Sequence, residues 1–296
     1  MTTTLVTGAT GQVGRRFVPR LLQWTEPGDT VRVLVRDAER GARFAELGAE
    51  VVLGDLRDET DRAKALAGAD RVINVAAAFR NVPDTEAWAV NRDAALALGR
   101  QALDAGVGRF VQTSTNLVYP AGRGRPTREG DRLVTGDAMV YSLSKAQADT
   151  GLLALHAEHG LPLVIVRLAY VYGEGDPHLR EAVPRVAEWT AHRRLPMVHH
   201  ADVAQALRRA LLAPGVEGRI FNAADDAPVS AFDVYRLNGL AWDETAARED
   251  APDPWFGITD SQSLRDELGW RPRPVETTIV DSAESLRHLG LLEANA

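Results

Sequence analysis

The chain has 296 residues, 25% of them charged, and a formal net charge of -7, which suits one large globular domain with or without a smaller lobe. The negative charge repels phosphate backbones and disfavours nucleic acid as a partner, and the absence of cysteine excludes disulfides, thiolate zinc sites and cysteine nucleophiles. The most apolar stretch, residues 161–172, is too short to span a bilayer and the N-terminus lacks a basic leader, so we expect a cytoplasmic protein without membrane contact.

The first half of the chain alternates short β-rich runs with longer amphipathic runs. Strands are predicted at residues 3–6, 30–35, 50–53, 71–75, 109–113 and 163–168. Helices are predicted between them at residues 12–22, 38–47, 58–66, 84–105 and 139–159. Continuous Val, Ile and Leu runs are typical of strands buried on both faces, and the alternation implies right-handed crossovers. The pattern therefore predicts an α/β fold with a doubly wound parallel sheet, the Rossmann architecture.

The regularity weakens in the second half of the chain. Residues 173–177 hold two glycines and a proline and indicate a loop, residues 202–212 indicate a helix, and residues 219–222 indicate a seventh strand. Residues 225–296 are rich in Pro and Trp and show two short helical patterns.

These patterns predict two parts of unequal size. We expect a dinucleotide-binding domain over residues 1–168, completed by about residues 199–224. Residues 169–198 and 225–296 then form a small C-terminal substrate-binding lobe. It would cover the carboxyl edge of the sheet, where open α/β sheets bind ligands.

A glycine-rich loop follows the first predicted strand and opens the first predicted helix, which is the context that a dinucleotide loop requires. Gly8 permits the tight turn, Gly11 lets the backbone approach a pyrophosphate, and Gly14 lets the helix pack close to the strand. The helix N-terminus then offers N–H groups and a positive dipole end to the phosphates. The predicted cofactor contacts of this loop are Gly8, Thr10, Gly11, Gln12, Val13 and Gly14.

The end of the second predicted strand bears on which nicotinamide cofactor binds. An acidic group there would bind the ribose 2′-hydroxyl of NAD, and a cationic group would accommodate the 2′-phosphate of NADP. Arg36 comes first after the strand and has a planar fork that suits a phosphate, and Arg15 could add charge. Asp37 either serves NAD or pairs with a neighbouring arginine. We predict NADP(H) as the preferred cofactor, with NAD(H) as the alternative.

A tyrosine and a lysine lie four residues apart at the start of a predicted helix. Tyr141 and Lys145 therefore share one helical face. A nearby ammonium stabilises a phenolate and lowers the tyrosine pKa from about 10, which suits general acid–base work, and the lysine could also bind the nicotinamide ribose. Such a pair is common on helix surfaces, but the upstream glycine loop favours catalysis. The fifth strand ends in three hydroxyls, at Thr113, Ser114 and Thr115, which could bind the reacting oxygen.

Together these residues resemble an extended short-chain dehydrogenase/reductase of the NAD-dependent epimerase/dehydratase family. The likeness rests on the Gly-x-x-Gly-x-x-Gly spacing, on Tyr-x-x-x-Lys, and on further segments along the chain. These segments are residues 90–93, 167–173, 198–204, 221–223 and 267–272. The resemblance places the third catalytic residue at Thr115, beside Tyr141 and Lys145. It implies an enzyme with a nicotinamide cofactor.

The resemblance also assigns further contacts. An Asp-Leu pair after the third strand flanks the adenine, and small residues after the fourth strand let the cofactor lie against the backbone. The cofactor contacts predicted outside the glycine loop are Arg36, Asp55, Leu56, Ala76, Ala77, Ala78, Asn91, Tyr141, Lys145 and Leu168. Tyr170 and Thr115 are the predicted substrate contacts.

Departures from the family pattern bear on the substrate. Sugar-nucleotide dehydratases carry Asp-Glu where this chain has Asn116 and Leu117, and many epimerases carry a sugar-binding Asn where it has Tyr170. The segment between Gly173 and His199 is also short. The leading hypothesis is hydride transfer between the nicotinamide and a small carbonyl or alcohol substrate. The alternatives are a nucleotide-sugar epimerase with bound NAD and an NADP-sensing regulatory protein.

Two further expectations concern metals and assembly. His199, His200 and Asp202 could suggest a metal site, but no further ligand cluster is evident and no metal is predicted. The family often forms homodimers through its two long helices, here residues 84–105 and 139–159. The outward residues of these helices could form that contact or could pack on the sheet.

Overall fold

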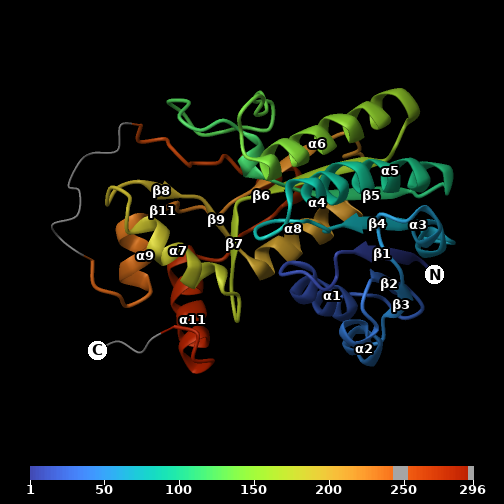
Figure 1. Ribbon diagram of the computed structural model, residues 1–296, viewed down its shortest axis with the longest axis horizontal. Helices are drawn as coiled ribbons and strands as arrows, with labels where there is room; N and C mark the ends of the chain where they lie inside the picture. The colour runs from blue at the N-terminus through green and yellow to red at the C-terminus, as the bar shows by residue number, and fades with distance from the viewer. Residues whose placement is uncertain (243–252, 293–296) are drawn as a thin grey trace. The chain divides into compact units, whose positions relative to one another are not determined.

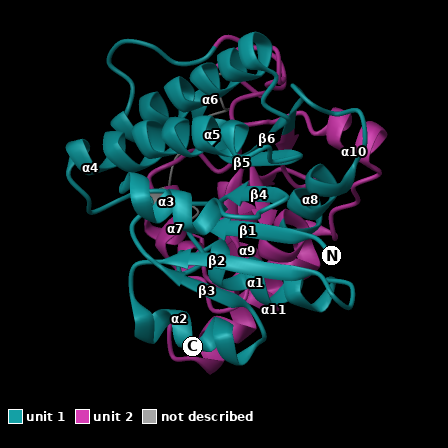
Figure 2. Ribbon diagram, turned by 90° about the vertical axis from the view of Figure 1, so that its right-hand side faces the viewer, with its two compact units in different colours: residues 1–118, 133–167, 204–221 teal, residues 119–132, 168–203, 222–296 magenta. Residues whose placement is uncertain are grey.

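The computed structural model describes residues 1–242 and 253–292. The predicted C-terminal lobe extends into residues 243–252 and 293–296, and these parts of it lie outside the described residues. The chain divides into two compact units, which Figure 2 colours separately. Unit 1 comprises residues 1–118, 133–167 and 204–221, and unit 2 comprises residues 119–132, 168–203 and 222–296. Residues 119–132 therefore group with the second unit, although the predicted boundary placed them in the first domain.

Unit 1 is built on a seven-stranded sheet with the order β10-β6-β5-β4-β1-β2-β3. The strands are β1 (Thr3–Thr7), β2 (Thr30–Val35), β3 (Glu50–Leu53), β4 (Arg71–Asn74), β5 (Arg109–Thr115), β6 (Leu163–Leu168) and β10 (Ile220–Ala223). The central strand β1 runs parallel to both of its neighbours, with Thr4 opposite Val31 of β2 and Arg71 of β4. The strand order reverses at β1, as a doubly wound sheet requires, and confirms the predicted Rossmann architecture.

Helices cover both faces of this sheet (Figure 1). On one face lie α1 (Gly14–Gln23), α2 (Ala38–Glu46) and α8 (His200–Leu212). On the other face lie α3 (Glu59–Leu66), α4 (Asp84–Trp88), α5 (Ala95–Asp104) and α6 (Val140–His159). Asp37 and Asp58 cap α2 and α3 with their side chains, which explains why these two helices begin within a residue of the predicted positions. A short 3-10 turn, η2 (Asn116–Val118), follows β5.

The long helix predicted over residues 84–105 is three segments in the structure. Between α4 and α5 lies a π-helix, η1 (Ala89–Ala94). Apolar periodicity predicts helical structure but not the change in hydrogen-bond spacing from four to five residues. Such π segments occur frequently at functional sites, and this one contains Asn91, which was predicted to bind cofactor.

The helices α5 and α6 approach closely because glycines lie at their contact. A Cβ at Gly99 would lie 2.6 Å from Leu152 Cδ2, and one at Gly151 would lie 2.6 Å from Leu96 Cδ2. Leu152 is fully buried in the hydrophobic core of unit 1, so for this residue packing inside the protein replaces the outward dimer contact considered from the sequence. The contact fixes α6, the helix that carries Tyr141.

Unit 2 contains more regular structure than the loop and two helices predicted there. Its elements are β7 (Tyr170–Tyr172), α7 (His178–Val186), β8 (Arg194–Leu195), β9 (Met197–His199), β11 (Val229–Ser230), α9 (Ala231–Leu237), α10 (Gln262–Leu268) and α11 (Val275–His288). Helix α7 was missed because Pro184 interrupts its pattern, although Leu179, Ala182 and Val186 form a buried face at helical spacing. Among the helices of the described residues, none has the length and apolar character needed to cross a membrane.

Candidate active site

The glycine loop of unit 1 closes against the end of β4. Gly8 has a φ of +72°, and a Cβ there would lie 2.5 Å from the Cα of Ala76. A Cβ at Gly14 would lie 2.2 Å from the carbonyl oxygen of Gly8. At Gly11 a Cβ would meet a single atom of the described residues, the Gly8 carbonyl oxygen at 3.3 Å. Packing inside the protein therefore demands Gly8 and Gly14, whereas a closely approaching ligand accounts better for Gly11.

Helix α1 begins at this loop without a side-chain cap. Its N-cap residue Val13 makes no side-chain hydrogen bond, and the first turn holds no acidic residue. The loop itself is tied down, because the Thr10 carbonyl accepts from Arg40 at 2.7 Å and Gln12 Oε1 accepts from Arg16 at 2.9 Å. An uncapped helix start presents N–H donors and positive dipole charge. The loop residues therefore fit the pyrophosphate of a dinucleotide.

Tyr141 begins α6 and lies among aromatic and hydroxyl groups. Its ring stacks on Phe79, with the ring centroids 4.2 Å apart. Burial raises the pKa of Tyr141 to about 12, with a smaller upward effect of the Asp149 charge; a hydrogen bond with the Thr115 hydroxyl and the charge of Arg80 act in the opposite direction. Near neutral pH the side chain is therefore a protonated phenol that has a hydroxyl partner.

Lys145 lies one turn further along α6 and is almost completely buried. Its ammonium donates to the carbonyl oxygens of Ala76 at 3.3 Å and Thr113 at 3.2 Å. Burial lowers the pKa of Lys145 to about 8, and the carboxylate of Asp149 acts against this lowering. The lowering of the Tyr141 pKa expected from this ammonium is not found, because burial of the phenol outweighs the charges around it.

The three hydroxyls at the end of β5 have different surroundings. Thr115 bonds to Tyr141 and also accepts from the backbone N–H of Leu117 at 3.2 Å. Ser114 donates instead to Asp149 at 2.9 Å, and Thr113 Oγ1 is buried without a partner among the described residues. The structure thus brings Thr115, rather than its two neighbours, beside the tyrosine.

A buried ion pair that the sequence analysis missed lies behind these residues. Asp149 Oδ2 accepts from Arg167 Nε at 2.8 Å, and both side chains are at most 1% exposed. Burial raises the pKa of Asp149, and the Arg167 charge lowers it. A signal for the pair was available, since Asp149 follows Lys145 by one helical turn and Arg167 interrupts an apolar strand. The Asp149 charge of this pair acts on the pKa values of Tyr141 and Lys145, and its carboxylate also accepts from Ser114.

Asn91 in η1 acts as a clamp in the structure. Its Oδ1 accepts from the Ala78 N–H at 2.8 Å, and its Nδ2 donates to the Ala78 carbonyl at 2.9 Å and to Ser144 Oγ at 3.1 Å. Ser144 in turn donates to the Tyr141 carbonyl at 2.9 Å. The side chain therefore joins the backbone after β4 to the start of α6, and its direct contact with a cofactor stays a prediction.

The residues after β2 bear on cofactor choice. Arg36 is exposed directly after the strand. Asp37 is the N-cap of α2 and accepts from the Arg40 N–H at 3.1 Å, a structural role that the sequence analysis did not consider. Asp55 after β3 is held by Arg57, whose hydrogen bonds are the largest cause that keeps the pKa of Asp55 below its usual value. Of the two residues that were weighed, Asp37 is therefore engaged in capping α2, whereas Arg36 is exposed and its charge helps to lower the pKa of Asp55.

The remaining predicted contact residues differ in how far they are buried and in the unit to which they belong. Leu56 and Ala78 are buried, Ala77 is exposed and Ala76 is half-buried against Gly8. Leu168 and Tyr170 belong to unit 2, where the Tyr170 hydroxyl donates to the His178 carbonyl at 2.7 Å. Their predicted roles in cofactor and substrate binding stay predictions.

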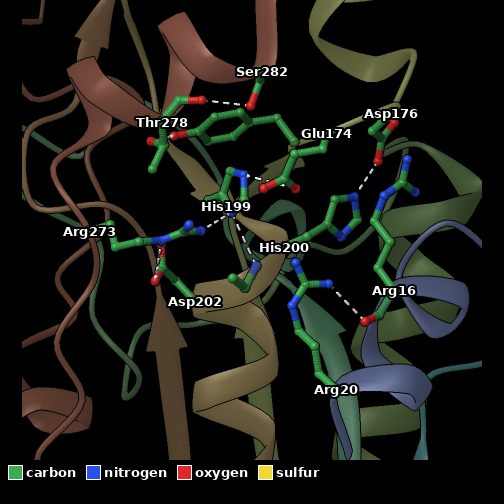
Figure 3. Close-up of polar contacts among 12 residues, drawn as sticks. Arg16, Arg20, Glu174, Asp176, His199, His200, Asp202, Arg273, Thr278 and Ser282 are labelled. Atoms are coloured by element: carbon green, nitrogen blue, oxygen red, sulfur yellow. Dashed lines mark hydrogen bonds and ion pairs between the residues drawn. The ribbon is translucent and has the colours of Figure 1, made fainter. Parts of the chain in front are cut away.

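The neighbouring histidines His199 and His200 have different partners (Figure 3). His200 Nε2 lies 2.5 Å from Asp176 Oδ2, while His199 contacts the Arg273 guanidinium. Arg273 also donates to Asp202 Oδ1 at 3.4 Å. In the part of the chain that the structure describes, no group of three His, Cys, Asp or Glu side chains is arranged for a metal ion. His199, His200, Asp176 and Asp202 are buried, and each is engaged in a polar contact with another side chain.

Other residues near the glycine loop and Tyr141 were missed from the sequence. Thr7 Oγ1 donates to Asn74 Oδ1 at 2.6 Å, and Asn74 Nδ2 donates to Gln112 Oε1 at 2.8 Å. Polar residues inside apolar strands were the available signal for this buried chain of hydrogen bonds. Phe79 and Arg80 gave no signal, because their proximity to Tyr141 depends on how the chain turns after β4. Arg80 has a φ of +52° there, which is rare outside glycine and costs free energy.

Comparison with known proteins is consistent with this geometry. The model of the NAD-dependent epimerase/dehydratase family matches residues 4–224. The chain belongs to this family. Membership in this family, which is of the extended short-chain dehydrogenase/reductase type, implies a nicotinamide cofactor and confirms the resemblance inferred from the glycine loop and the Tyr-x-x-x-Lys pair.

Individual relatives differ in the reactions that their names describe. The UDP-glucose 4-epimerase of Vibrio cholerae is 25% identical, with 90% of each chain covered. The 4-hydroxy-2-methyl-3-oxo-4-farnesyl-3,4-dihydroquinoline-1-oxide ketoreductase of Stigmatella aurantiaca is 30% identical over 76% of this chain and 69% of its own. The structure of a dTDP-glucose 4,6-dehydratase from Streptomyces venezuelae shares the fold, with a TM-score of 0.80, 24% identity and 99% coverage of both chains.

Proposed function

We propose that this protein is an NAD(P)-dependent oxidoreductase that transfers hydride between a nicotinamide cofactor and a small carbonyl or alcohol substrate. The observation that carries the proposal is the Thr115–Tyr141 hydrogen bond beside the buried Lys145. A phenol that stays protonated near neutral pH suits the donor in carbonyl reduction. The similarity to a ketoreductase supports the same reaction class.

The residues of this chain have distinct roles in the proposed reduction. The cofactor, when bound, supplies the hydride. The hydroxyls of Thr115 and Tyr141 donate hydrogen bonds to the carbonyl oxygen and orient it. As hydride reaches the carbonyl carbon, the carbonyl oxygen gains negative charge and takes the phenolic proton of Tyr141, because an alkoxide is a stronger base than a phenolate. Solvent then reprotonates the phenolate, while the buried ammonium of Lys145, one helical turn away, would bind the nicotinamide ribose.

Elimination of water is disfavoured as the reaction. Asn116 and Leu117 stand where sugar-nucleotide dehydratases carry an acid pair, and neither side chain is an acid or base that could act at neutral pH. The short turn η2, which follows β5, consists of Asn116, Leu117 and Val118 and therefore holds no carboxylate. The similarity to dehydratases therefore supports the fold and the cofactor class rather than the reaction.

We propose NADP(H) as the preferred cofactor. Arg36 is the exposed cation after β2, and Asp37 is engaged in capping α2. A planar guanidinium suits the 2′-phosphate, because it can donate two parallel hydrogen bonds. Titration of purified protein with NADPH and NADH tests this: we expect tighter NADPH binding, lost in Arg36→Ala. Equal binding of both cofactors, or preference for NADH, would refute the proposal.

The reaction class is tested with Tyr141→Phe. A positioned general acid contributes about 10²- to 10⁴-fold, so NADPH oxidation in a screen of aldehydes and ketones should fall by that factor while NADPH still binds. If the variant kept every activity of the wild type, the NADP-sensing alternative would replace the enzyme proposal.

Epimerisation of a nucleotide sugar is the second candidate, favoured by the similarity to a UDP-glucose 4-epimerase over 90% of both chains. Such an enzyme uses the same hydroxyls but returns the hydride to the other face of the sugar. NAD retained through purification, together with turnover of a nucleotide sugar without net cofactor consumption, would identify it.

A further inference from the structure

One arginine of unit 2 lies against aromatic rings from two distant segments. The Arg193 guanidinium carbon is 4.0 Å from the ring centroid of Trp189 and 4.5 Å from that of Phe256. Trp189 follows α7 and Arg193 directly precedes β8, whereas Phe256 belongs to a turn before α10. The two rings attract the cation through their π faces.

The turn that carries Phe256 is held firmly against β8. Gly257 has a φ of +76°, and a Cβ there would lie 2.6 Å from the carbonyl oxygen of Arg194. The turn is closed by bonds to Asp253, whose carbonyl accepts from the Phe256 N–H at 3.0 Å and whose Oδ1 accepts from the Trp255 N–H at 2.9 Å. The position of Phe256 over Arg193 is therefore built into the backbone.

The guanidinium of Arg193 lacks a polar partner within the described residues. No hydrogen bond or ion pair there engages it, and its Nε is buried without an acceptor. Burial lowers the pKa of Arg193, and no acidic group of residues 1–242 or 253–292 acts against that lowering. A guanidinium has five N–H donors, and aromatic rings give it no oxygen acceptor. Arg194 differs, because it donates to the Pro228 carbonyl at 2.8 Å.

Exposed apolar rings lie beside the same segment. Phe232 is 43% exposed at the start of α9, and its N–H donates to the Ala191 carbonyl at 3.1 Å. The N–H of Ala231 donates to the Arg193 carbonyl at 2.9 Å, so α9 begins against the strand that follows Arg193. Trp255, next to Phe256, is 45% exposed. Two exposed rings are therefore carried by the segments that adjoin Arg193 and Phe256.

We propose that Arg193, held by Trp189 and Phe256, binds an oxyanion, either a carboxylate or a phosphate ester, carried on an apolar body that packs on Trp255 and Phe232. An oxyanion supplies the acceptors that the guanidinium lacks, and the geometry of the fork suits a bidentate contact. The site lies wholly in unit 2, and its ligand binding does not depend on the proposed hydride transfer.

Calorimetric titration of the full chain with phenyl phosphate, benzoate and phenol tests this proposal. We expect saturable binding of at least one of the two anions, with phenol bound more weakly. Arg193→Gln should weaken anion binding about tenfold or more, whereas the matched variant Arg194→Gln should bind as the wild type does. The tighter of the two anions identifies the group that the site takes.

Three outcomes would overturn the proposal: no saturable binding of either anion, equal affinity in Arg193→Gln, or phenol bound as tightly as the anions. The thermal unfolding temperature of each variant shows whether it folds. Should Arg193→Gln fail to fold, Arg193→Lys keeps the charge without the planar fork. It should also bind the anions more weakly, and unchanged affinity in that variant would equally count against the site.

Discussion

Replacement of Gly11 by alanine should separate cofactor binding from folding. The added Cβ would meet the Gly8 carbonyl oxygen at 3.3 Å, so a shift of a few tenths of an ångström accommodates it, and we expect a stability change of about 0.5 kcal/mol or less. Gly14→Ala is the matched comparison, because its Cβ would lie 2.2 Å from the same oxygen and 2.6 Å from Ala9 Cα. Overpacking of that kind costs about 1–3 kcal/mol or more.

Gly11→Ala, the variant expected to lose little stability, should nevertheless lose cofactor affinity. The methyl group of Gly11→Ala occupies the space through which a pyrophosphate reaches the backbone N–H groups. A hydrogen bond to a charged group contributes about 1.5–3 kcal/mol, so loss of one such bond raises the dissociation constant about 10- to 150-fold.

Two measurements on the same protein preparations decide the matter. Thermal unfolding gives the stability of wild type, Gly11→Ala and Gly14→Ala, and titration with NADPH and NADH gives their affinities. The reasoning fails if Gly11→Ala binds both cofactors as tightly as the wild type. It also fails if Gly11→Ala loses as much stability as Gly14→Ala does, because Gly11 would then serve packing.

Three further predictions concern buried polar groups. Burial raises the pKa of Asp225 to about 8 from 3.8, so the stability that its neutral form contributes is complete below about pH 4 and is lost as the pH rises to about 8. Asp225→Asn should remove that loss, which is on the order of 5 kcal/mol at pH 9. Urea unfolding at pH 5 and 9 measures it, and a variant with the same pH dependence as the wild type would be the contrary result. Asp149→Asn leaves the buried charge of Arg167 unpaired and should cost about 3–5 kcal/mol in urea unfolding at pH 7; a cost below 1 kcal/mol would contradict the buried pair. Asn91→Ala removes the clamp between the backbone after β4 and α6, and should lower kcat more than it raises the KM for NADPH; a change confined to KM would instead indicate direct cofactor contact.

Local patterns predicted the elements of unit 1 well. The strands β2, β3 and β6 begin and end at the residues expected from their apolar runs. For β6, which is buried along its whole length, the reason is that a strand buried on both faces has a continuous apolar sequence. The glycine loop and the Tyr-x-x-x-Lys pair were likewise recognisable, since each depends on spacing along one short segment. The π-helix η1 and the helix α7 were not predicted, because a change of hydrogen-bond spacing and a proline within a helix leave no regular period.

The amino-acid sequence by itself determined the sheet, the cofactor class and the shared helical face of Tyr141 and Lys145, because steric freedom at glycine, apolar burial and the period of a helix act over a few neighbouring residues. Tertiary structure decided which strand-end hydroxyl bonds to Tyr141, and it paired Asp149 with Arg167. It also reversed the expected shift of the tyrosine pKa. These features arise from residues distant in the chain, and the free energy of a charge or a phenol depends on how fully packing removes it from water.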